Sequence, residues 1–208
     1  MSSVTVQFTD FGFIASYEVD INPESPAAGE WGVPSFMFGG RSKDRLTIRI
    51  RPPLTKPWVA SFAVEGNGHY LNGLFACPNP EQLLVAACID AYLIQVRRPG
   101  NADHLPISPV LHVQRPLGMD LLVVGSFTNL AAVDHSGLRW VTGRLFIDDL
   151  ELIEGPPGKI CVRGSVNSIP SAPELLIIDP SRGDLIEGLQ YTDFARPHGQ
   201  PAWRRAGI

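Results

Sequence analysis

Apolar runs typical of β-strands recur in the second half of the chain at intervals of about 40 residues. Each recurrence pairs one apolar run with a second across a short link of small or polar residues. The pairs are Leu83–Cys88 with Ala91–Val96, Leu121–Ser126 with Asn129–Asp134, and Ile160–Ser165 with Glu174–Asp179. A further apolar segment precedes each pair, at Gly73–Cys77, Pro109–Val113 and Asp149–Ile153.

The second and third pairs are followed by a turn and a candidate fourth strand, at Leu138–Val141 and Asp184–Glu187. Four short strands in about 40 residues is the spacing of a β-propeller blade. The pattern therefore predicts three blade-like antiparallel repeats between residues 71 and 191. One segment inside the first repeat, Pro80–Ala91, also has helix-favouring residues. We interpret it as strand because the corresponding segments of the other repeats have strand patterns, and we expect an all-β chain.

The residues before the repeats contain further strand-like runs at Phe11–Ile21, Leu46–Arg51 and Trp58–Val64. Because closed propellers typically need at least four blades, residues 1–70 must help to complete the core. We expect an N-terminal β segment that forms either a degenerate fourth blade or a sheet packed on the repeats, hence a partial or small propeller. A two-sheet β-sandwich of the same strands is the alternative. The predicted organisation is a single domain over residues 1–208, with residues 192–208 as a C-terminal tail.

The second repeat, VVGSFTNLAAVDHSGLRWVTG, resembles the blade repeat of quinoprotein-type β-propellers. The third, VRGS…ELLIIDPSRGDLIEG, is similar but carries an insertion at Val166–Pro173, and the first lacks the Asp-Gly turn. The whole chain also resembles uncharacterised bacterial proteins with an FTN…DxxGxxW segment. These resemblances imply a scaffold and no activity, and no quinone-contacting residue can be carried over.

Composition narrows the classes of partner and the compartment. The formal net charge of −4 gives no general attraction to nucleic acid or to an anionic membrane. The N-terminus lacks a signal-peptide pattern, and there is no apolar run of 18 residues. Cys77, Cys88 and Cys161 are an odd, widely spaced set in apolar runs, which favours buried free thiols in a reducing compartment. We therefore expect a cytoplasmic protein.

The residues that could act in catalysis or bind a metal do not form a known catalytic or metal-binding motif. The five histidines share no short metal-ligand spacing. Asp148 and Asp149 are neighbours that a strand would point to opposite faces. Asp134, His135 and Ser136 cannot form a triad because they are adjacent, and we expect Asp134 and Ser136 to bond the backbone of a hairpin turn. The sequence thus predicts no catalytic, cofactor-binding or metal-binding residue and no cofactor.

The most unusual segment, Gly29–Gly40, combines three aromatic residues and a methionine with four glycines. Exposed aromatic residues in loops are typical of binding surfaces, so we predict that Trp31, Phe36 and Phe38 contact a partner. The alternative is a core strand at Ser35–Phe38. The leading hypothesis is a non-catalytic protein-interaction module (a scaffold, immunity or inhibitor-like protein) that binds another protein or a second copy. The alternative is an enzyme or carbohydrate-binding module with a shallow cleft, which needs two convergent carboxylates or a histidine beside a carboxylate.

Overall fold

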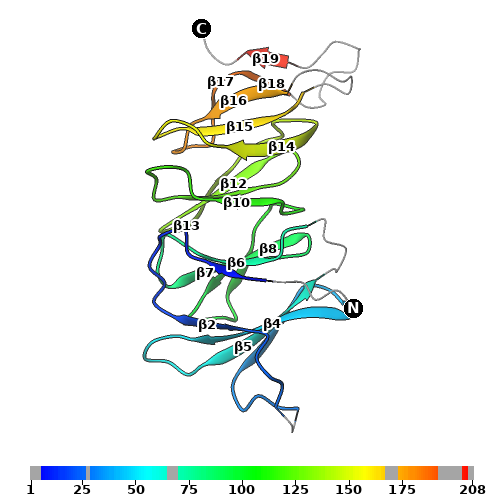
Figure 1. Ribbon diagram of the computed structural model, residues 1–208, viewed down its shortest axis with the longest axis vertical. Helices are drawn as coiled ribbons and strands as arrows, with labels where there is room; N and C mark the ends of the chain where they lie inside the picture. The colour runs from blue at the N-terminus through cyan, green and yellow to red at the C-terminus, as the bar shows by residue number, and fades with distance from the viewer. Residues whose placement is uncertain (1–5, 27–28, 65–69, 167–172, 192–202, 206–208) are drawn as a thin grey trace. The chain divides into compact units, whose positions relative to one another are not determined.

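The computed structural model describes residues 6–26, 29–64, 70–166, 173–191 and 203–205, and these form strands and loops without a helix (Figure 1). The chain divides into two compact units, Met1–Val110 and Leu111–Ile208. Each unit has its own buried core cluster, to which at least two sheets contribute. The all-β class is confirmed. Within each unit, the sheets fit a blade-like arrangement as well as the sandwich that the sequence left open.

The first unit contains two sheets. One has the order β2-β4-β5-β3, and its strands are β2 (Glu18–Ile21), β4 (Asp44–Arg51), β5 (Trp58–Val64) and β3 (Ser35–Phe38). The other has the order β1-β6-β7-β8-β9, with β1 (Phe8–Thr9), β6 (Gly73–Ala76), β7 (Gln82–Ala87), β8 (Asp90–Gln95) and β9 (Ala102–His104). Of the predicted N-terminal β segment, β2 to β5 thus form a four-stranded sheet that packs on the first repeat, and β1 joins the sheet of the first repeat itself. The first repeat also has a fourth strand, β9, which the sequence pattern did not reveal.

The second unit contains the other two repeats as four-stranded meanders. One sheet consists of β10 (His112–Gln114), β11 (Leu122–Gly125), β12 (Leu130–Asp134) and β13 (Gly137–Val141). The next consists of β14 (Asp148–Ile153), β15 (Ile160–Ser165), β16 (Glu174–Ile178) and β17 (Leu185–Glu187). A two-stranded sheet follows, β18 (Leu189–Tyr191) with β19 (Trp203–Arg205), so three residues of the predicted C-terminal tail form a strand. The predicted insertion lies mostly outside the described residues.

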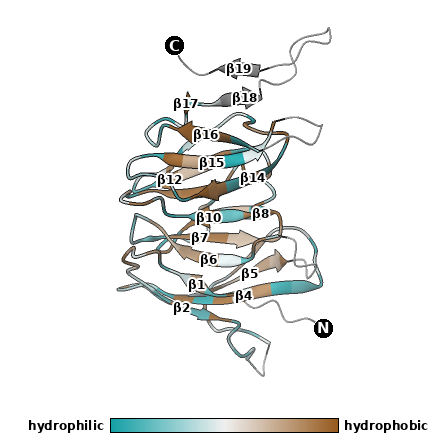
Figure 2. Cartoon of the chain, turned by 45° about the horizontal axis from the view of Figure 1, so that its top comes forward, coloured by the Kyte–Doolittle hydropathy of each residue, from teal (hydrophilic) through white to brown (hydrophobic). Residues whose placement is uncertain are grey.

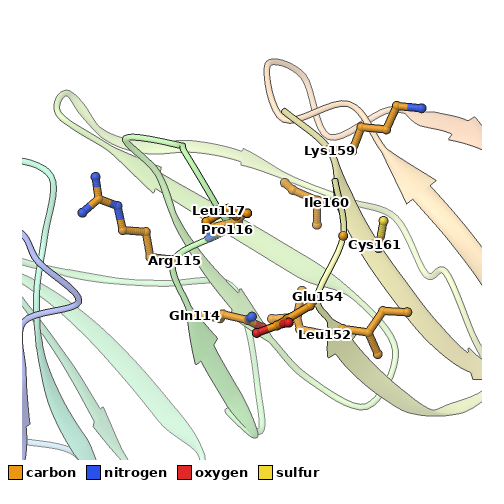
Figure 3. A pocket seen from close by; sticks show the side chains of 11 residues that line it. Gln114, Arg115, Pro116, Leu117, Leu152, Glu154, Lys159, Ile160 and Cys161 are labelled. Atoms are coloured by element: carbon orange, nitrogen blue, oxygen red, sulfur yellow. The ribbon is translucent and has the colours of Figure 1, made fainter. Parts of the chain in front are cut away.

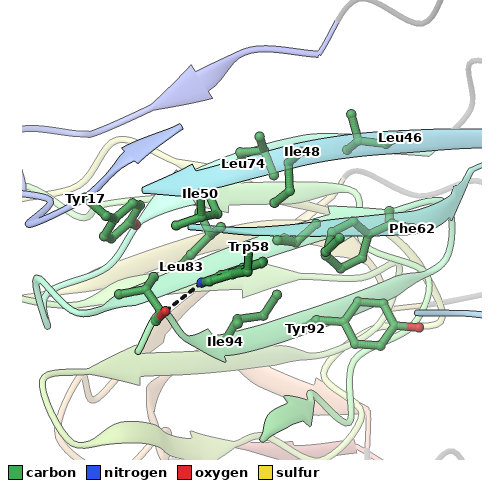
Figure 4. Close-up of a cluster of buried hydrophobic side chains, with 14 of the residues drawn as sticks. Tyr17, Leu46, Ile48, Ile50, Trp58, Phe62, Leu74, Leu83, Tyr92 and Ile94 are labelled. Carbon is green, nitrogen blue, oxygen red and sulfur yellow. Dashed lines mark hydrogen bonds between the residues drawn. The ribbon is translucent and has the colours of Figure 1, made fainter. Parts of the chain in front are cut away.

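Alternation of side chains decides which face of each sheet is buried. Along β4, Leu46, Ile48 and Ile50 are buried and the residues between them are not. The buried residues are hydrophobic and their neighbours polar, and Figure 2 accordingly shows β4 in bands of brown and teal. The buried face of β4 meets Trp58 and Phe62 from β5, together with residues of β6 to β8 (Figure 4). The indole N–H of Trp58 donates to the carbonyl oxygen of Val96 at 2.7 Å. This hydrogen bond ties the first sheet of the unit to the segment that follows β8.

A similar hydrogen bond joins the two meanders of the second unit. The indole N–H of Trp140, in β13, donates to the carbonyl oxygen of Pro180 at 2.9 Å, in the turn between β16 and β17. The Arg139 Nε donates to the carbonyl oxygen of Ser181 in the same turn at 3.0 Å. In both units, therefore, a tryptophan indole donates to a backbone carbonyl of the following repeat, about 40 residues along the chain.

The predicted hairpin turn at Asp134 is confirmed. The Oδ1 atom of Asp134 accepts hydrogen bonds from the Ser136 backbone N–H at 2.7 Å and from its hydroxyl at 2.6 Å. Asp179 and Ser181 make the same pair of bonds in the third repeat. Although burial opposes ionisation of Asp134, the bonds from Ser136 and the charge of Arg139 lower the pKa of this carboxyl below its ordinary value.

This lowered pKa gives a pH dependence with a definite sign. A carboxyl whose pKa is depressed by folding stabilises the protein above the unfolded-state pKa of about 3.9, and the contribution disappears as pH falls through the folded-state pKa. We expect Asp134→Asn to lower the free energy of unfolding at pH 7 by about 0.5–1.5 kcal/mol, because the amide keeps an acceptor oxygen but loses the charge that strengthens the bonds from Ser136 and Arg139. The difference from wild type should shrink below pH 4 in urea titrations at several pH values. A difference that is constant down to pH 2 would contradict this assignment.

All three cysteines are buried and none forms a disulfide, as predicted. Burial raises the pKa of the Cys77 thiol to about 12, so the reactive thiolate is scarce at neutral pH. We expect a thiol reagent to label Cys77 at least about a hundredfold more slowly in the native protein than in urea, because labelling requires local opening. Mass spectrometry of a labelling time course measures this rate. Rapid labelling of all three thiols in the native protein would contradict their buried positions in the structure.

Candidate partner-binding surface

The loop before β3 is shaped by two glycines with left-handed backbone. Gly29 and Gly32 have φ angles of +74° and +63°, which other residues adopt only at a cost, and they flank Glu30 and Trp31. The Trp31 ring is half-buried and lies against the Arg49 guanidinium, 5.2 Å from its carbon to the ring centroid. This cation–π contact fixes one side of the indole against β4.

Phe36 and Phe38 point from β3 towards the core rather than into solvent. The ring of Phe36 meets Trp58 edge-on at 6.1 Å, and that of Phe38 stacks on Phe62 at 5.0 Å. Both residues are half-buried and pack on the core cluster of the first unit. The strand at Ser35–Phe38, which was the alternative, therefore exists. The assignment of Phe36 and Phe38 as partner contacts stays a prediction, and the packing gives both residues a structural role.

The opposite side of β3 exposes Met37, which the sequence reasoning did not select. Its exposed fraction is 76%, and its neighbour Ser35 is exposed as well. Because successive side chains of a strand point to opposite faces, the inward Phe36 and Phe38 place Met37 outward. The alternation in Ser-Phe-Met-Phe was the signal that could have identified it.

An open depression of about 590 Å³ lies beside this strand. It is lined by residues 29–35 and Lys56, so Trp31 and Ser35 both border it. Glu30 and Lys56 bring one negative and one positive charge to the lining. We call Trp31, Met37 and the lining of this depression the Trp31 surface. It combines a partly exposed indole, an exposed thioether and an uncharged strand.

The free edge of β3 adds backbone groups to this surface. β3 is an outer strand that pairs with β5 in parallel. The Val59 N–H donates to the Pro34 carbonyl oxygen at 2.9 Å. In a parallel ladder, this bond means that the backbone N–H and C=O of Phe36 point towards β5. The backbone N–H and C=O of Ser35 and Met37 then point away from β5. Within the described residues, the outward groups of Ser35 and Met37 have no backbone partner.

A histidine–carboxylate pair lies elsewhere in the first unit. Asp90 contacts His104 Nε2 at 2.9 Å through Oδ1 and accepts from the Tyr92 hydroxyl at 3.1 Å through Oδ2. Burial and then the Asp90 charge raise the pKa of Tyr92 to about 12, so this hydroxyl remains a proton donor. The pair meets one requirement of the enzyme alternative. Among the described residues, no serine, threonine or cysteine side chain hydrogen-bonds to this pair.

A more enclosed pocket, of about 200 Å³, lies in the second unit (Figure 3). Its lining comes from three segments: residues 114–117, which begin with the last residue of β10; residues 152–155, around the end of β14; and residues 159–161, around the start of β15. Among its described lining residues, Glu154 is the sole carboxylate and there is no histidine. This pocket therefore lacks the paired acids of a glycosidase.

Two further kinds of feature are absent from the part of the chain that the structure describes. No group of three or more His, Cys, Asp or Glu side chains there could hold a metal ion. No helix there is long and apolar enough to cross a membrane.

Comparisons with known proteins add little to this geometry. No family model and no curated protein matches the chain. A solved structure that matches is the N-terminal domain of Nup159, with 13% identity and a TM-score of 0.37. The match covers 86% of this chain and 52% of that one, so the chain spans about half the length of the structure that it matches.

Proposed function

We propose that the chain is a non-catalytic protein-interaction module that binds another protein through the Trp31 surface. The observation that carries the proposal is the coincidence of an exposed Met37, a partly exposed Trp31 and an open strand edge at one place. Tryptophan and methionine are enriched in protein interfaces, and an open edge can add backbone hydrogen bonds. A compact β-sheet core holds these groups in place, so little ordering entropy is lost on binding.

The finer resemblances belong to the same proposal. The Gly-Ser strands and Asp turns support a quinoprotein-like blade used as a scaffold, in a chain of bacterial type. Three buried cysteines that form no disulfide support a reducing compartment such as the cytoplasm. A scaffold, immunity or inhibitor-like role would each use the Trp31 surface to hold a partner.

A second candidate function is the binding of a small ligand, such as a sugar, in the pocket of the second unit. Leu117 is 67% exposed beside this pocket, and Glu154 and Lys159 supply polar groups at its rim. A monosaccharide titration followed by NMR would favour this function if it shifted the signals of Leu117 and Ile160. If these signals did not change at millimolar sugar, the binding of a sugar in this pocket would be excluded.

The test of the main proposal is affinity purification with matched variants. The wild-type chain, Trp31→Ala and Leu54→Ala are tagged and expressed in cells that naturally produce the protein. Leu54 is 97% exposed, which makes it a control for the loss of an exposed apolar side chain. We expect a partner that wild type and Leu54→Ala retain and that Trp31→Ala loses. A partner that all three chains retain equally would contradict binding through the Trp31 surface. An enzyme substrate in place of a protein partner would contradict the assignment as a non-catalytic module.

Alanine substitutions of Trp31 and Phe38 should differ in how much they lower the free energy of unfolding. We expect Phe38→Ala to lower the free energy of unfolding by about 1–3 kcal/mol, somewhat less than a fully buried phenylalanine. Trp31→Ala should cost less than about 1 kcal/mol because its ring is not in the core cluster. Urea denaturation measures both values. If Phe38→Ala is as mild as Trp31→Ala, the stacking of Phe38 on Phe62 is not structural and its role as a partner contact gains weight.

A further inference from the structure

The outer strands of the sheets differ in how they are protected against pairing. Charged side chains on an edge strand discourage association with another strand. Such residues occur on β2, β9, β13, β14 and β17. β3, with the sequence Ser-Phe-Met-Phe, has none, and at four residues it is longer than β1, β10 and β18, which are also outer strands without Asp, Glu, Lys or Arg. Its edge is therefore open to pairing with another strand.

We propose that β3 pairs antiparallel with β3 of a second copy of the chain. This inference rests on the proposed function, since it uses the Trp31 surface as a protein-binding surface. The outward groups of Ser35 and Met37 are two residues apart, which is the spacing of successive bonding residues at one edge of a strand. A two-fold axis through Phe36 places Ser35 of each copy opposite Met37 of the other, and all four residues then exchange N–H···O bonds.

The same register makes the side chains complementary. Ser35 borders the depression beside Trp31, so an opposing Met37 side chain comes to lie next to that depression. Each copy thus offers one exposed thioether and receives one, as a two-fold interface requires. The charges also match, because Glu30 and Lys56 give each copy one acid and one base at the depression. A second copy is therefore not repelled at this contact.

Sedimentation equilibrium of the purified full chain tests the pairing, with the chain itself as the probe. We expect wild type to dimerise and Met37→Pro to dimerise at least about tenfold more weakly. Proline removes the outward N–H of residue 37 together with the thioether, but it breaks no bond to β5, since residue 37 directs its backbone groups away from β5, and an edge strand accepts it. Met37→Leu keeps the N–H and an apolar side chain, and should dimerise like wild type. Thermal melting of each variant verifies that it folds.

Cross-linking tests the register. A mixture of Ser35→Cys and Met37→Cys chains should form a disulfide-linked heterodimer under mild oxidation, since opposed bonding residues have Cα atoms about 5.5 Å apart, within disulfide range. Each variant alone should not, because its cysteine lies opposite a residue without a thiol. Homodimer disulfides from either variant alone would overturn the antiparallel register.

The outcomes also separate this inference from the proposed function. A monomeric wild type that still retains a partner in a Trp31-dependent way would overturn the pairing and leave the function in place. A wild-type dimer that Met37→Pro and Trp31→Ala do not weaken would likewise overturn the pairing at β3. A monomeric wild type with no Trp31-dependent partner would overturn both.

Discussion

Replacing Trp58 by alanine should lower the free energy of unfolding by about 3–5 kcal/mol, the range found for large aromatic side chains in cores. The side chain of Trp58 is almost completely buried in the core cluster of the first unit. It contacts the ring of Phe36, and its indole N–H satisfies the carbonyl of Val96. Alanine would leave a cavity and an unpaired carbonyl in the same place. Urea denaturation at pH 7 measures the loss.

A second substitution isolates the hydrogen bond. Trp58→Phe keeps most of the apolar contact and removes the donor, so we expect about 1–3 kcal/mol of destabilisation from the buried Val96 carbonyl and the smaller ring. Trp31→Ala serves as the control for loss of a tryptophan outside the core. If Trp58→Phe were neutral, the hydrogen bond to Val96 would contribute nothing. The link between the two sheets would then come from apolar packing and from other hydrogen bonds, such as that from the Tyr17 hydroxyl to the Gln82 carbonyl at 2.8 Å.

The sequence predicts the regular strands of this protein well, for a physical reason. Strands β7, β8, β11 and β12 are buried on both faces or nearly so, and such strands appear as continuous apolar runs that recur from repeat to repeat. Asp134 and Ser136 could also be assigned, because an Asx turn depends on neighbouring residues. Features of this kind are local in the chain or repeated along it.

The features that escaped prediction depend on distant partners. β9 has the sequence Ala-Asp-His and joins a sheet only because β8 offers it an edge. β3 precedes β4 in the chain but lies beyond β5 in the sheet, an order that no local pattern encodes. The direction of Phe36 and Phe38 followed from that placement, since their inward face was set by Trp58 and Phe62. The predicted binding segment was thus found as a segment, while the division of its side chains between core and surface required the fold.

The turn between β16 and β17 provides the second large expected effect. Gly183 has a φ of +75°, and a Cβ at this position would lie 2.7 Å from the ring of Trp140. Gly183→Ala therefore combines backbone strain of about 1–2 kcal/mol with overpacking of about 1–3 kcal/mol. We expect the free energy of unfolding to fall by about 2–5 kcal/mol in all.

Matched variants separate the two contributions. Gly158 lies in the same unit with a φ of +83°, and a Cβ there would meet nothing within 4 Å. Gly158→Ala should therefore show the strain alone, about 1–2 kcal/mol. The overpacking should disappear when the Trp140 ring is absent, so Gly183→Ala should cost less in a Trp140→Ala background than in wild type. Equal costs in both backgrounds would show that the indole moves aside freely. In that case the hydrogen bond from Trp140 to Pro180 would not hold the turn against β13, and the connection between the two meanders would have to come from other contacts, among them the bond from Arg139 to Ser181 and the buried core cluster.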